Sequence, residues 1–414
     1  MSKKEQRKAP VLRFKGFTDD WEQKELIDVL KQHITDGPHE TPKIMKEGIP
    51  FISVEAIVNN KIDFKRKRGY ISNEYNEKCN QKYKPQKNDV YLVKSGSTVG
   101  KTAIVETNIP FNIWSPLAAL RPNNATSPYF LFYLLQTDNL QSQVINKSKG
   151  GTQPNLSMRL LEHFKIFVPN NIDYQTQIAR LLINVDKIIS LQQRKLKELK
   201  QIKGSLLTKI LAGKNSNQPI LRFRNFKNNW KQYRLKDLYT YSNGKAHEQS
   251  QQLNGKYELI NLNSISIDGS LKSSGKYVNK SKDILKKNDL VMVLSDIAHG
   301  LLLGRVAVIP KDNKYVLNQR IALLRPQKND ENSNFMASLI NNNQSYFYRM
   351  GSGTSQLNIS KSAVTESKWF IPEPDEQLAI GNLLKEIDNY IFLQQDKINQ
   401  LTALRKFLSQ NLFI

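Results

Sequence analysis

The sequence of 414 residues has almost no cysteine and no long apolar run. Cys79 is its only cysteine, which excludes an internal disulfide and a cysteine-based zinc cluster and fits an ordinary residue in a reducing cytosol. No run approaches the roughly 18 apolar residues that span a bilayer. The charged opening Met-Ser-Lys-Lys-Glu is followed by no apolar signal region. The sequence therefore predicts a soluble cytoplasmic protein.

Acidic residues are scarce relative to basic ones. Lys and Arg number 62 against 37 Asp and Glu, which gives a net charge of +25. A charge of this sign favours a polyanionic partner, nucleic acid first, with a membrane surface or an acidic protein as the alternatives. Part of the excess has a simpler explanation, because the chain is rich in Lys, Asn and Ile, as expected of an AT-rich genome.

Motifs that carry catalysis are also missing. Residues 95–102 resemble a phosphate-binding loop, but only three residues separate Gly96 from Gly100, where that loop requires four. A strand-turn-strand with a basic tip is the better interpretation. Residues 127–130 stand one proline short of the motif with which amino-methyltransferases hold a flipped base, and they predict a helix start. Since the five histidines also lack metal-ligand spacing, we expect no catalytic residue and no metal site.

The chain is rich in internal repetition. Residues 10–21, from Pro10 to Trp21, return at a constant offset as residues 219–230. A repeat of half the chain is longer than the roughly 20–50 residues of a solenoid unit, and it indicates two homologous halves. Further matched segments are 89–94 with 289–294, Gly100-Lys101 with Gly304-Arg305, and 117–122 with 321–326. The first of these pairs is short, apolar and preceded by a Lys-Asn turn, which predicts strands. Because the halves differ freely between these matches, we expect one mixed strand-and-helix fold with two different surfaces.

Each half ends in a heptad pattern typical of a coiled coil. Apolar residues alternate at spacings of four and three, interrupted by polar residues at equivalent steps of the two copies. So long and narrow a seam favours pairing of the two helices with each other. The alternative is two amphipathic helices that each pack on their own domain. Residues 213–218 form a stop signal and linker after the first helix. The predicted seam consists of Ile178, Leu182, Val185, Ile189, Gln192, Leu196, Leu199 and Lys203, and of Ile380, Leu384, Ile387, Ile391, Gln394, Ile398, Leu401 and Arg405.

Two kinds of segment are candidates for DNA contact. Residues 61–70 carry five basic residues with Phe64 and Tyr70 interleaved, and can neutralise phosphates, although a solvated charged hairpin is an equal alternative. Residues 149–157 and 351–360 share a Gly-Thr pattern followed by Gln and Asn, whose amides pair with adenine in the major groove. The alternative is a structural turn whose Asn and Thr cap the next element. Recurrence in both halves favours this structural role, because target sequences should differ. The candidate DNA-binding residues are Lys65, Arg66, Lys67, Arg68, Lys94, Lys101, Lys149, Thr152, Gln153, Asn155, Arg305, Thr354, Gln356 and Asn358.

Together these features resemble the specificity subunit of type I restriction-modification systems, over the whole chain. The resemblance rests on the paired Leu-Arg-Phe openings, the two Gly-Thr segments and the two heptad helices led by Gln175 and Gln377. It implies a mixed α/β fold in which two homologous globular target recognition domains are separated by two long helices, an antiparallel coiled coil with a pseudo-twofold repeat. The implied division is a first domain at 1–172, a first long helix at 173–213, a linker at 214–218, a second domain at 219–373 and a second long helix at 374–414.

The same resemblance implies that each domain reads one half of a split DNA target. The helices and adjoining regions would dock two methyltransferase subunits, and restriction subunits would complete an ATP-driven endonuclease. We expect this chain to bind no cofactor and to be non-catalytic by itself, with S-adenosylmethionine, ATP and Mg²⁺ held by the partner subunits. The competing interpretations are a basic coiled-coil protein that binds DNA or is structural without sequence preference, and a stand-alone nucleic-acid enzyme.

Overall fold

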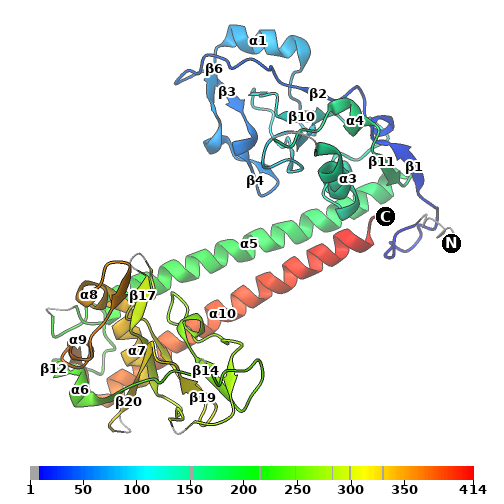
Figure 1. The fold of residues 1–414 in the computed structure, drawn as a ribbon. Coiled ribbons are helices and arrows are strands. Elements are labelled where there is room, and N and C mark those ends of the chain that lie inside the picture. The colour runs from blue at the N-terminus through cyan, green and yellow to red at the C-terminus, as the bar shows by residue number, and fades with distance from the viewer. Residues whose placement is uncertain are drawn as a thin grey trace. The chain divides into compact units, whose positions relative to one another are not determined.

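The computed structural model describes residues 9–149, 153–213, 216–247, 249–281, 283–297, 300–328 and 331–414 (Figure 1). Its contacts divide the chain into two compact units, one of residues 1–192 with 397–414 and the other of residues 193–396. Each unit therefore contains one mixed domain and a segment of both long helices, α5 (Ile172–Ile210) and α10 (Pro374–Asn411).

Two sheets form the first domain. The four-stranded antiparallel sheet has the order β2 (Thr35–Asp36), β10 (Leu117–Leu120), β7 (Val90–Val93) and β8 (Thr102–Ile104). The three-stranded sheet has the order β6 (Gly69–Ile71), β3 (Ile49–Ile52) and β9 (Asn112–Ile113), with β3 and β9 parallel. Strand β7 is apolar throughout because both of its faces are buried. Val90 and Leu92 pack in the cluster of helix α2 (Pro128–Leu134), whereas Tyr91 and Val93 pack against residues of the three-stranded sheet.

The second domain repeats this topology. Its four-stranded sheet has the order β13 (Tyr239–Asn243), β20 (Ile321–Pro326), β16 (Leu290–Val293) and β18 (Val306–Val308). Its three-stranded sheet has the order β15 (Tyr277–Val278), β14 (Tyr257–Ile260) and β19 (Tyr315–Leu317), with β14 and β19 parallel. The strands predicted at 89–94 and 289–294 are thus confirmed as β7 and β16, and both halves have the same fold.

Shorter elements complete the two domains. The two-stranded pairs are β1 (Glu22–Glu25) with β11 (Lys165–Val168), β12 (Lys231–Arg234) with β22 (Lys368–Ile371), β4 (Ile57–Val58) with β5 (Lys61–Ile62), and β17 (Ser295–Ile297) with β21 (Gln356–Asn358). The shorter helices are α1 (Asn73–Lys82), α3 (Asp138–Ser148), α4 (Met158–Glu162), α6 (Leu235–Leu238), α7 (Ser333–Asn342), α8 (Gln344–Met350) and α9 (Lys361–Thr365). The 3₁₀ turns are η1 (Leu26–Val29), η2 (Val54–Ala56), η3 (Phe64–Arg66) and η4 (Leu262–Ser264). The predicted helix start at residues 127–130 is confirmed, because Pro128 opens α2 directly after Ser127.

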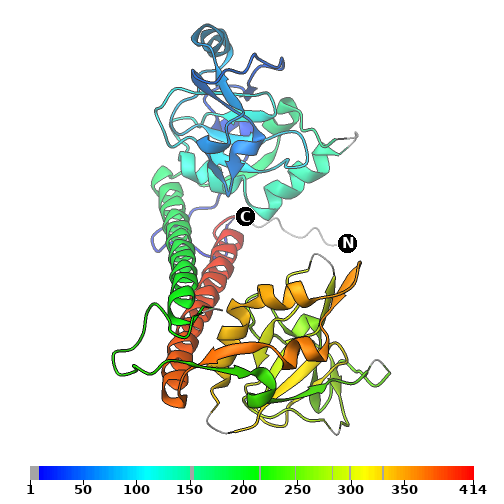
Figure 2. The same ribbon diagram turned by 90° about the vertical axis from the view of Figure 1, so that its left-hand side faces the viewer.

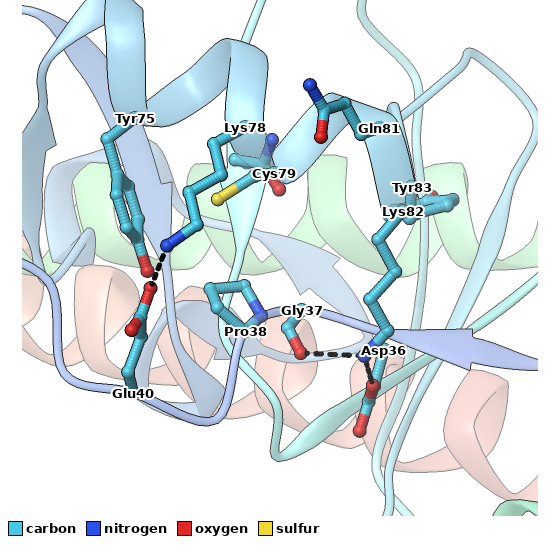
Figure 3. A pocket seen from close by; sticks show the side chains of 11 residues that line it. Asp36, Gly37, Pro38, Glu40, Tyr75, Lys78, Cys79, Gln81, Lys82 and Tyr83 are labelled. Carbon is cyan, nitrogen blue, oxygen red and sulfur yellow. Dashed lines mark hydrogen bonds and ion pairs between the residues drawn. The ribbon is translucent and has the colours of Figure 1, made fainter.

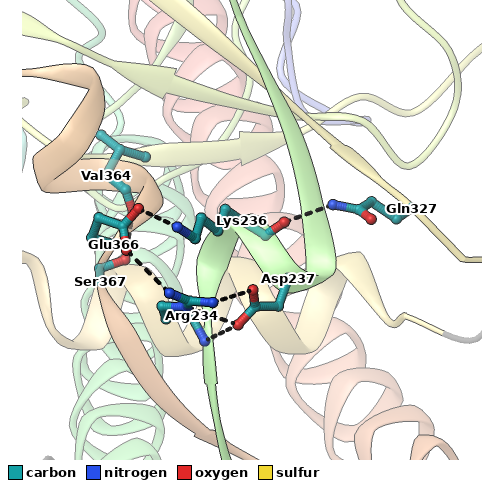
Figure 4. Close-up of polar contacts among 7 residues, drawn as sticks. All are labelled: Arg234, Lys236, Asp237, Gln327, Val364, Glu366 and Ser367. Atoms are coloured by element: carbon teal, nitrogen blue, oxygen red, sulfur yellow. Dashed lines mark hydrogen bonds and ion pairs between the residues drawn. The ribbon is translucent and has the colours of Figure 1, made fainter.

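A cluster of polar contacts holds α6 beside the β12–β22 pair (Figure 4). The Arg234 guanidinium lies 3.2 Å from the Asp237 carboxylate, and the Lys236 ammonium lies 2.6 Å from Glu366. The Gln327 side-chain amide donates to the backbone carbonyl of Lys236 at 2.7 Å. These side chains are substantially exposed, so each ion pair contributes little to stability.

A buried ion pair explains two of the repeated sequence segments. Arg121 holds Asp89 in the first domain, with 2.7 Å between Nε and Oδ1, and Arg325 holds Asp289 in the second at 2.8 Å. Each aspartate is only 1% exposed. A buried carboxylate is strongly destabilising without a partner. The two segments therefore have to be kept together in both halves.

The long helices pair in opposite directions (Figure 2). The predicted seam residues are buried or half-buried in both copies. Its two basic interruptions are ion-paired across the two helices: Arg405 lies 3.2 Å from Asp186 in the first unit, and Lys203 pairs with Asp388 in the second. These are the same two heptad positions in each copy, as an antiparallel pseudo-twofold pair requires. The alternative of two helices that pack separately is wrong. Among the described residues, no helix has the length and apolar character needed to cross a bilayer.

The C-terminal end of each long helix enters the core of the other half's domain. Leu412 and Phe413, just beyond α10, belong to the apolar core of the first domain. Ile210, Leu211 and Ala212 at the end of α5 occupy the same place in the second. Figure 1 shows the C-terminus beside α3 and the β1–β11 pair. Neither domain core is complete without the helix end that the other repeat supplies.

The repeated opening segments bind these helix ends. The Leu12 backbone N–H donates to the Asn411 carbonyl at 2.9 Å, and the Leu221 N–H donates to the Lys209 carbonyl at 2.8 Å. The last carbonyls of a helix lack partners within the helix, so each opening segment satisfies one of them. The tryptophan that closes the segment is buried, and Trp21 packs edge-on against Phe413 with 6.2 Å between ring centroids.

The residues just beyond α10, Leu412 and Phe413, should stabilise the first domain. Phe413→Ala should lower its free energy of unfolding by about 3 kcal/mol, because a buried aromatic ring is lost. Phe407→Ala is the matched control, since Phe407 is 51% exposed and Phe413 only 4%. Urea unfolding and amide hydrogen exchange in β1 and α2 would measure both variants. Equal effects of the two substitutions would contradict a stabilising role of the α10 end in the core of the first domain.

Candidate nucleic-acid interface

In both domains two loops meet at the carboxyl end of the parallel strand pair. Residues 53–55 follow β3 and residues 114–116 follow β9, and the Trp114 N–H donates to the Ile52 carbonyl at 2.9 Å. The second domain repeats the bond, with the Asn318 N–H 2.9 Å from the Ile260 carbonyl. The loops 261–263 and 318–320 are therefore held together as their counterparts are.

A third and a fourth segment join these loops. The Lys94 N–H donates to the Pro116 carbonyl at 2.8 Å, and the Leu294 N–H donates to the Arg320 carbonyl at 3.0 Å. The next residue pairs with a Gly-Thr segment, since Ser95 forms a β-bridge with Asn155 and Ser295 pairs with Asn358. We call this set of four segments the loop edge. It comprises residues 53–55, 94–96, 114–116 and 153–155 in the first domain, and 261–263, 294–296, 318–320 and 356–358 in the second.

The described residues of the two Gly-Thr segments expose most of their predicted polar side chains, but Gln356 is half-buried. Gln356 donates through Nε2 to the Ser295 hydroxyl at 2.9 Å and to Asn358 Oδ1 at 3.1 Å. The expectation that Asn or Thr caps the next element is wrong for the second half, because the Ser360 hydroxyl accepts the Ala363 N–H at the start of α9. The predicted residues Lys149, Gln153, Asn155, Thr354 and Asn358 are exposed, and Thr152 lies outside the described residues.

The basic segment 61–70 reaches the loop edge through one side chain. The Arg68 guanidinium lies 4.0 Å from the centre of the Trp114 ring, a cation–π contact. Lys67 lies 4.6 Å from the Tyr70 ring, and Arg66 pairs with Asp63 at 3.6 Å. Lys65, Arg66 and Arg68 are exposed, whereas Lys67 is half-buried.

The aromatic residues interleaved with these charges differ in their roles. Phe64 packs edge-on against Phe111, with 5.4 Å between ring centroids, and belongs to the domain interior. It is therefore not a base-stacking platform.

Three other predicted contacts have different surroundings. The Lys94 side chain is 12% exposed and lies 3.2 Å from the carboxylate of fully buried Asp36, so it stabilises the domain. Arg305 donates to the Asn341 carbonyl at 2.9 Å, and burial lowers the pKa of its guanidinium. Lys101 is exposed in the turn between β7 and β8. Residues 95–102 thus form the predicted strand-turn-strand, and neither Lys94 nor Arg305 belongs to the exposed charge of the loop edge.

A hollow of about 380 Å³ lies between α1 and the segment after β2 (Figure 3). Its charged groups are paired with each other: Lys82 with Asp36, and Lys78 with Glu40 at 3.1 Å. Burial raises the pKa of the Cys79 thiol, which disfavours the reactive thiolate. This hollow is therefore unsuited to nucleophilic catalysis. In the described parts of the chain no three His, Cys, Asp or Glu side chains are grouped as metal ligands.

Several residues of the loop edge were not singled out by the sequence. Trp114, Asn263, Gln319 and Arg320 lie in short loops without a motif of their own. The available signal was positional: they follow strands that are equivalent in the two halves, yet the residues themselves differ. The fold thus repeats one framework in both halves, and the loop edge of each half carries different exposed residues.

Comparisons with known proteins agree with this architecture. The sequence profile of the type I restriction modification DNA specificity domain matches residues 18–201 and 227–403. The putative type I restriction enzyme MjaX specificity subunit of Methanocaldococcus jannaschii is 24% identical, covering 94% of this chain and 91% of the relative. The MjaVIII specificity subunit of the same organism is 22% identical with the same coverage.

Solved structures share the fold. The S subunit of a type I restriction-modification system from M. genitalium superposes with a TM-score of 0.64 at 16% identity, over 98% of this chain and 99% of that one. A chain from a structural study of type I complex assembly and conformational transition gives a TM-score of 0.57 at 14% identity, over 95% and 97%. The chain therefore belongs to the family of type I restriction-modification specificity subunits, with one DNA specificity domain in each half.

The repeated buried ion pair should be a condition of folding in each domain. Arg325→Met leaves buried Asp289 without its cation and should destabilise the second domain by about 3 kcal/mol. Arg234→Met removes a cation from an exposed pair in the same domain and should cost less than about 1 kcal/mol. Chemical denaturation would compare the two variants. An equal or smaller loss for Arg325→Met would show that this pair does not hold the sheet.

Proposed function

We propose that each half of the chain reads one part of a bipartite DNA target through its loop edge. The observation that carries this proposal is a shared framework with different exposed side chains. The same three backbone connections hold the loops in both domains. The first domain presents Arg68 on Trp114, whereas the second presents Asn263 and Arg320. Two domains that recognise different half-sites require a common backbone framework with different exposed side chains.

The basic excess supplies affinity that does not depend on sequence. Contacts to phosphates position a duplex, while contacts to base edges discriminate between sequences. Lys65 and Arg68 are suited to the first task, because they are exposed and form no ion pair with another described residue. A basic structural protein without sequence preference would show only this contribution.

The basic segment should contribute measurably to the salt dependence of DNA binding. Changing Lys65, Arg66 and Arg68 together to Ala should reduce the slope of log K against log salt by about 2–3, since each phosphate contact contributes about 0.9. Lys67→Ala is the control, because its ammonium is held against Tyr70. Titrations of the full chain with duplex DNA between 50 and 200 mM salt would measure both. An unchanged slope in the triple variant would make the segment a solvated hairpin.

The helix pair carries a surface suited to protein partners. Ile188, Leu191, Leu404 and Phe407 are exposed in the first unit, and Ile202, Tyr390 and Leu393 are exposed in the second. We call these residues the helix stripe. Residues three apart lie on one face of a helix, and heptad-equivalent positions of two antiparallel helices fall on the same side of the pair. Large exposed apolar side chains grouped in this way are typical of interaction surfaces.

We infer that the stripe docks modification subunits, one on each unit. Its two parts occupy equivalent heptad positions, because Ile188 and Leu191 correspond to Tyr390 and Leu393. A surface that occurs twice favours two copies of one partner, as the resemblance to type I specificity subunits suggests. Restriction subunits would then assemble with these modification subunits.

Charged substitutions should remove the partners one at a time. Leu191→Glu should reduce the number of co-expressed modification subunits per chain from two to one, and Leu191→Glu with Leu393→Glu should abolish binding. Ser190→Glu is the control, since it adds the same charge to the neighbouring position outside the stripe. Light scattering of the purified complexes would give the stoichiometry. Two bound subunits on the double variant would place the docking surface elsewhere.

We further propose that catalysis belongs to the partner subunits, with S-adenosylmethionine held by the modification subunits and ATP and Mg²⁺ by the restriction subunits. The turn at residues 95–102 supports this division. Strand β8 follows it, whereas a phosphate-binding loop directs its amides at the phosphates from the start of a helix. The turn therefore does not fit a nucleotide's phosphates.

A further inference from the structure

We propose that the second domain recognises the bases of its half-site with side chains that line a hollow of about 320 Å³ on its loop edge. The hollow is lined by Asn261, Leu262 and Asn263 from the loop after β14 and by Asn318, Gln319 and Arg320 from the loop after β19. The inference rests on the proposed function in DNA recognition, and it assigns the contacts that give the second half-site its sequence.

Two of the lining amides shape the backbone of the hollow. Asn261 Oδ1 accepts the Asn263 N–H at 2.9 Å, and Asn318 Oδ1 accepts the Gln319 N–H at 2.9 Å. The loops are therefore fixed by their own side chains, in addition to the bond between the Asn318 N–H and the Ile260 carbonyl. A pre-formed hollow loses little conformational entropy when it binds a ligand.

The remaining polar side chains point to recognition of purines. Asn263 and Arg320 are exposed, and the Arg320 guanidinium forms no ion pair with another residue that the structure describes. The planar fork of arginine matches O6 and N7 of guanine in the major groove, and asparagine or glutamine matches N6 and N7 of adenine. Arg320 can be tested most sharply. Loss of a guanine contact changes the sequence preference, whereas loss of a phosphate contact weakens binding to all sequences equally.

The first domain carries different side chains at the equivalent positions. Its corresponding loops are residues 53–55, Ser-Val-Glu, and residues 114–116, Trp-Ser-Pro. There Arg68 reaches in from the basic segment and lies on Trp114, whereas in the second domain the cation belongs to the loop itself. The framework bonds are shared and the polar side chains are not, which is the pattern that two unlike half-sites require.

Three substitutions in the full chain separate base reading from charge. Arg320→Ala removes both the cation and the fork. Arg320→Lys keeps the cation and removes the fork. Lys311→Ala is the matched control, because it removes one exposed positive charge near the start of β19, at the other end of the strand from Arg320. Both positions are exposed, and matching unfolding curves would verify that the three variants fold.

The experiment selects bound sequences from a random duplex DNA library. Affinities are then measured at fixed salt for the selected site and its single-base variants. The wild-type chain should prefer guanine at one position of one half-site by about 5–150-fold, the range of one bidentate base contact. Both Arg320 variants should lose this preference and keep that of the other half-site. Lys311→Ala should keep both.

Other results would overturn the proposal. Equal weakening of all sequences by Arg320→Ala, with the guanine preference retained, would make Arg320 a phosphate contact. A bipartite preference that neither variant alters would refute this assignment and leave the proposed function standing. A wild-type chain without any sequence preference would refute both.

Discussion

The burial of each long helix end in the domain of the other repeat is the constraint on which the structure depends. Phe413 lies against Trp21 and Phe130, and Ile210 and Leu211 lie in the core around Trp230. Each domain consequently contains chain from both halves. The antiparallel pairing of α5 and α10 follows, because a helix that starts from one domain has to finish in the other.

This arrangement separates the tasks of the molecule. Two kinds of ion pair recur in both halves: the buried Asp–Arg pair of the four-stranded sheet, and the partly exposed pairs of Lys203 and Arg405 between the long helices. The loop edge differs between the halves in its exposed side chains, while the same backbone bonds hold its loops in both. A specificity subunit benefits from this separation, since a new target requires new surface residues on an unchanged framework. The helix stripe is free of that requirement and recurs in both units.

The sequence predicted the repeat, the central strands and the seam, because each leaves a periodic or duplicated signal. The seam could be read residue by residue, since burial at a constant heptad position forces apolar side chains. The loop edge could not be read in this way. Arg320 and Trp114 belong to the site through parallel pairing of strands distant in sequence, which has no local pattern. The sequence wrongly predicted Lys94 as a surface contact. Its charge suggested DNA binding, but its partner is Asp36, which is buried and far away in sequence.

The most direct test of two independent recognition domains replaces the second domain by the first. The strand pairs β1–β11 and β12–β22 close the two domains in the same way, so residues 22–168 can be grafted in place of residues 231–371. Sequence selection on this chain should yield a symmetric target, in which the half-site of the first domain occurs twice as an inverted repeat. Retention of the original second half-site, or loss of all preference in a folded chain, would contradict two independent readers on one pseudo-twofold frame.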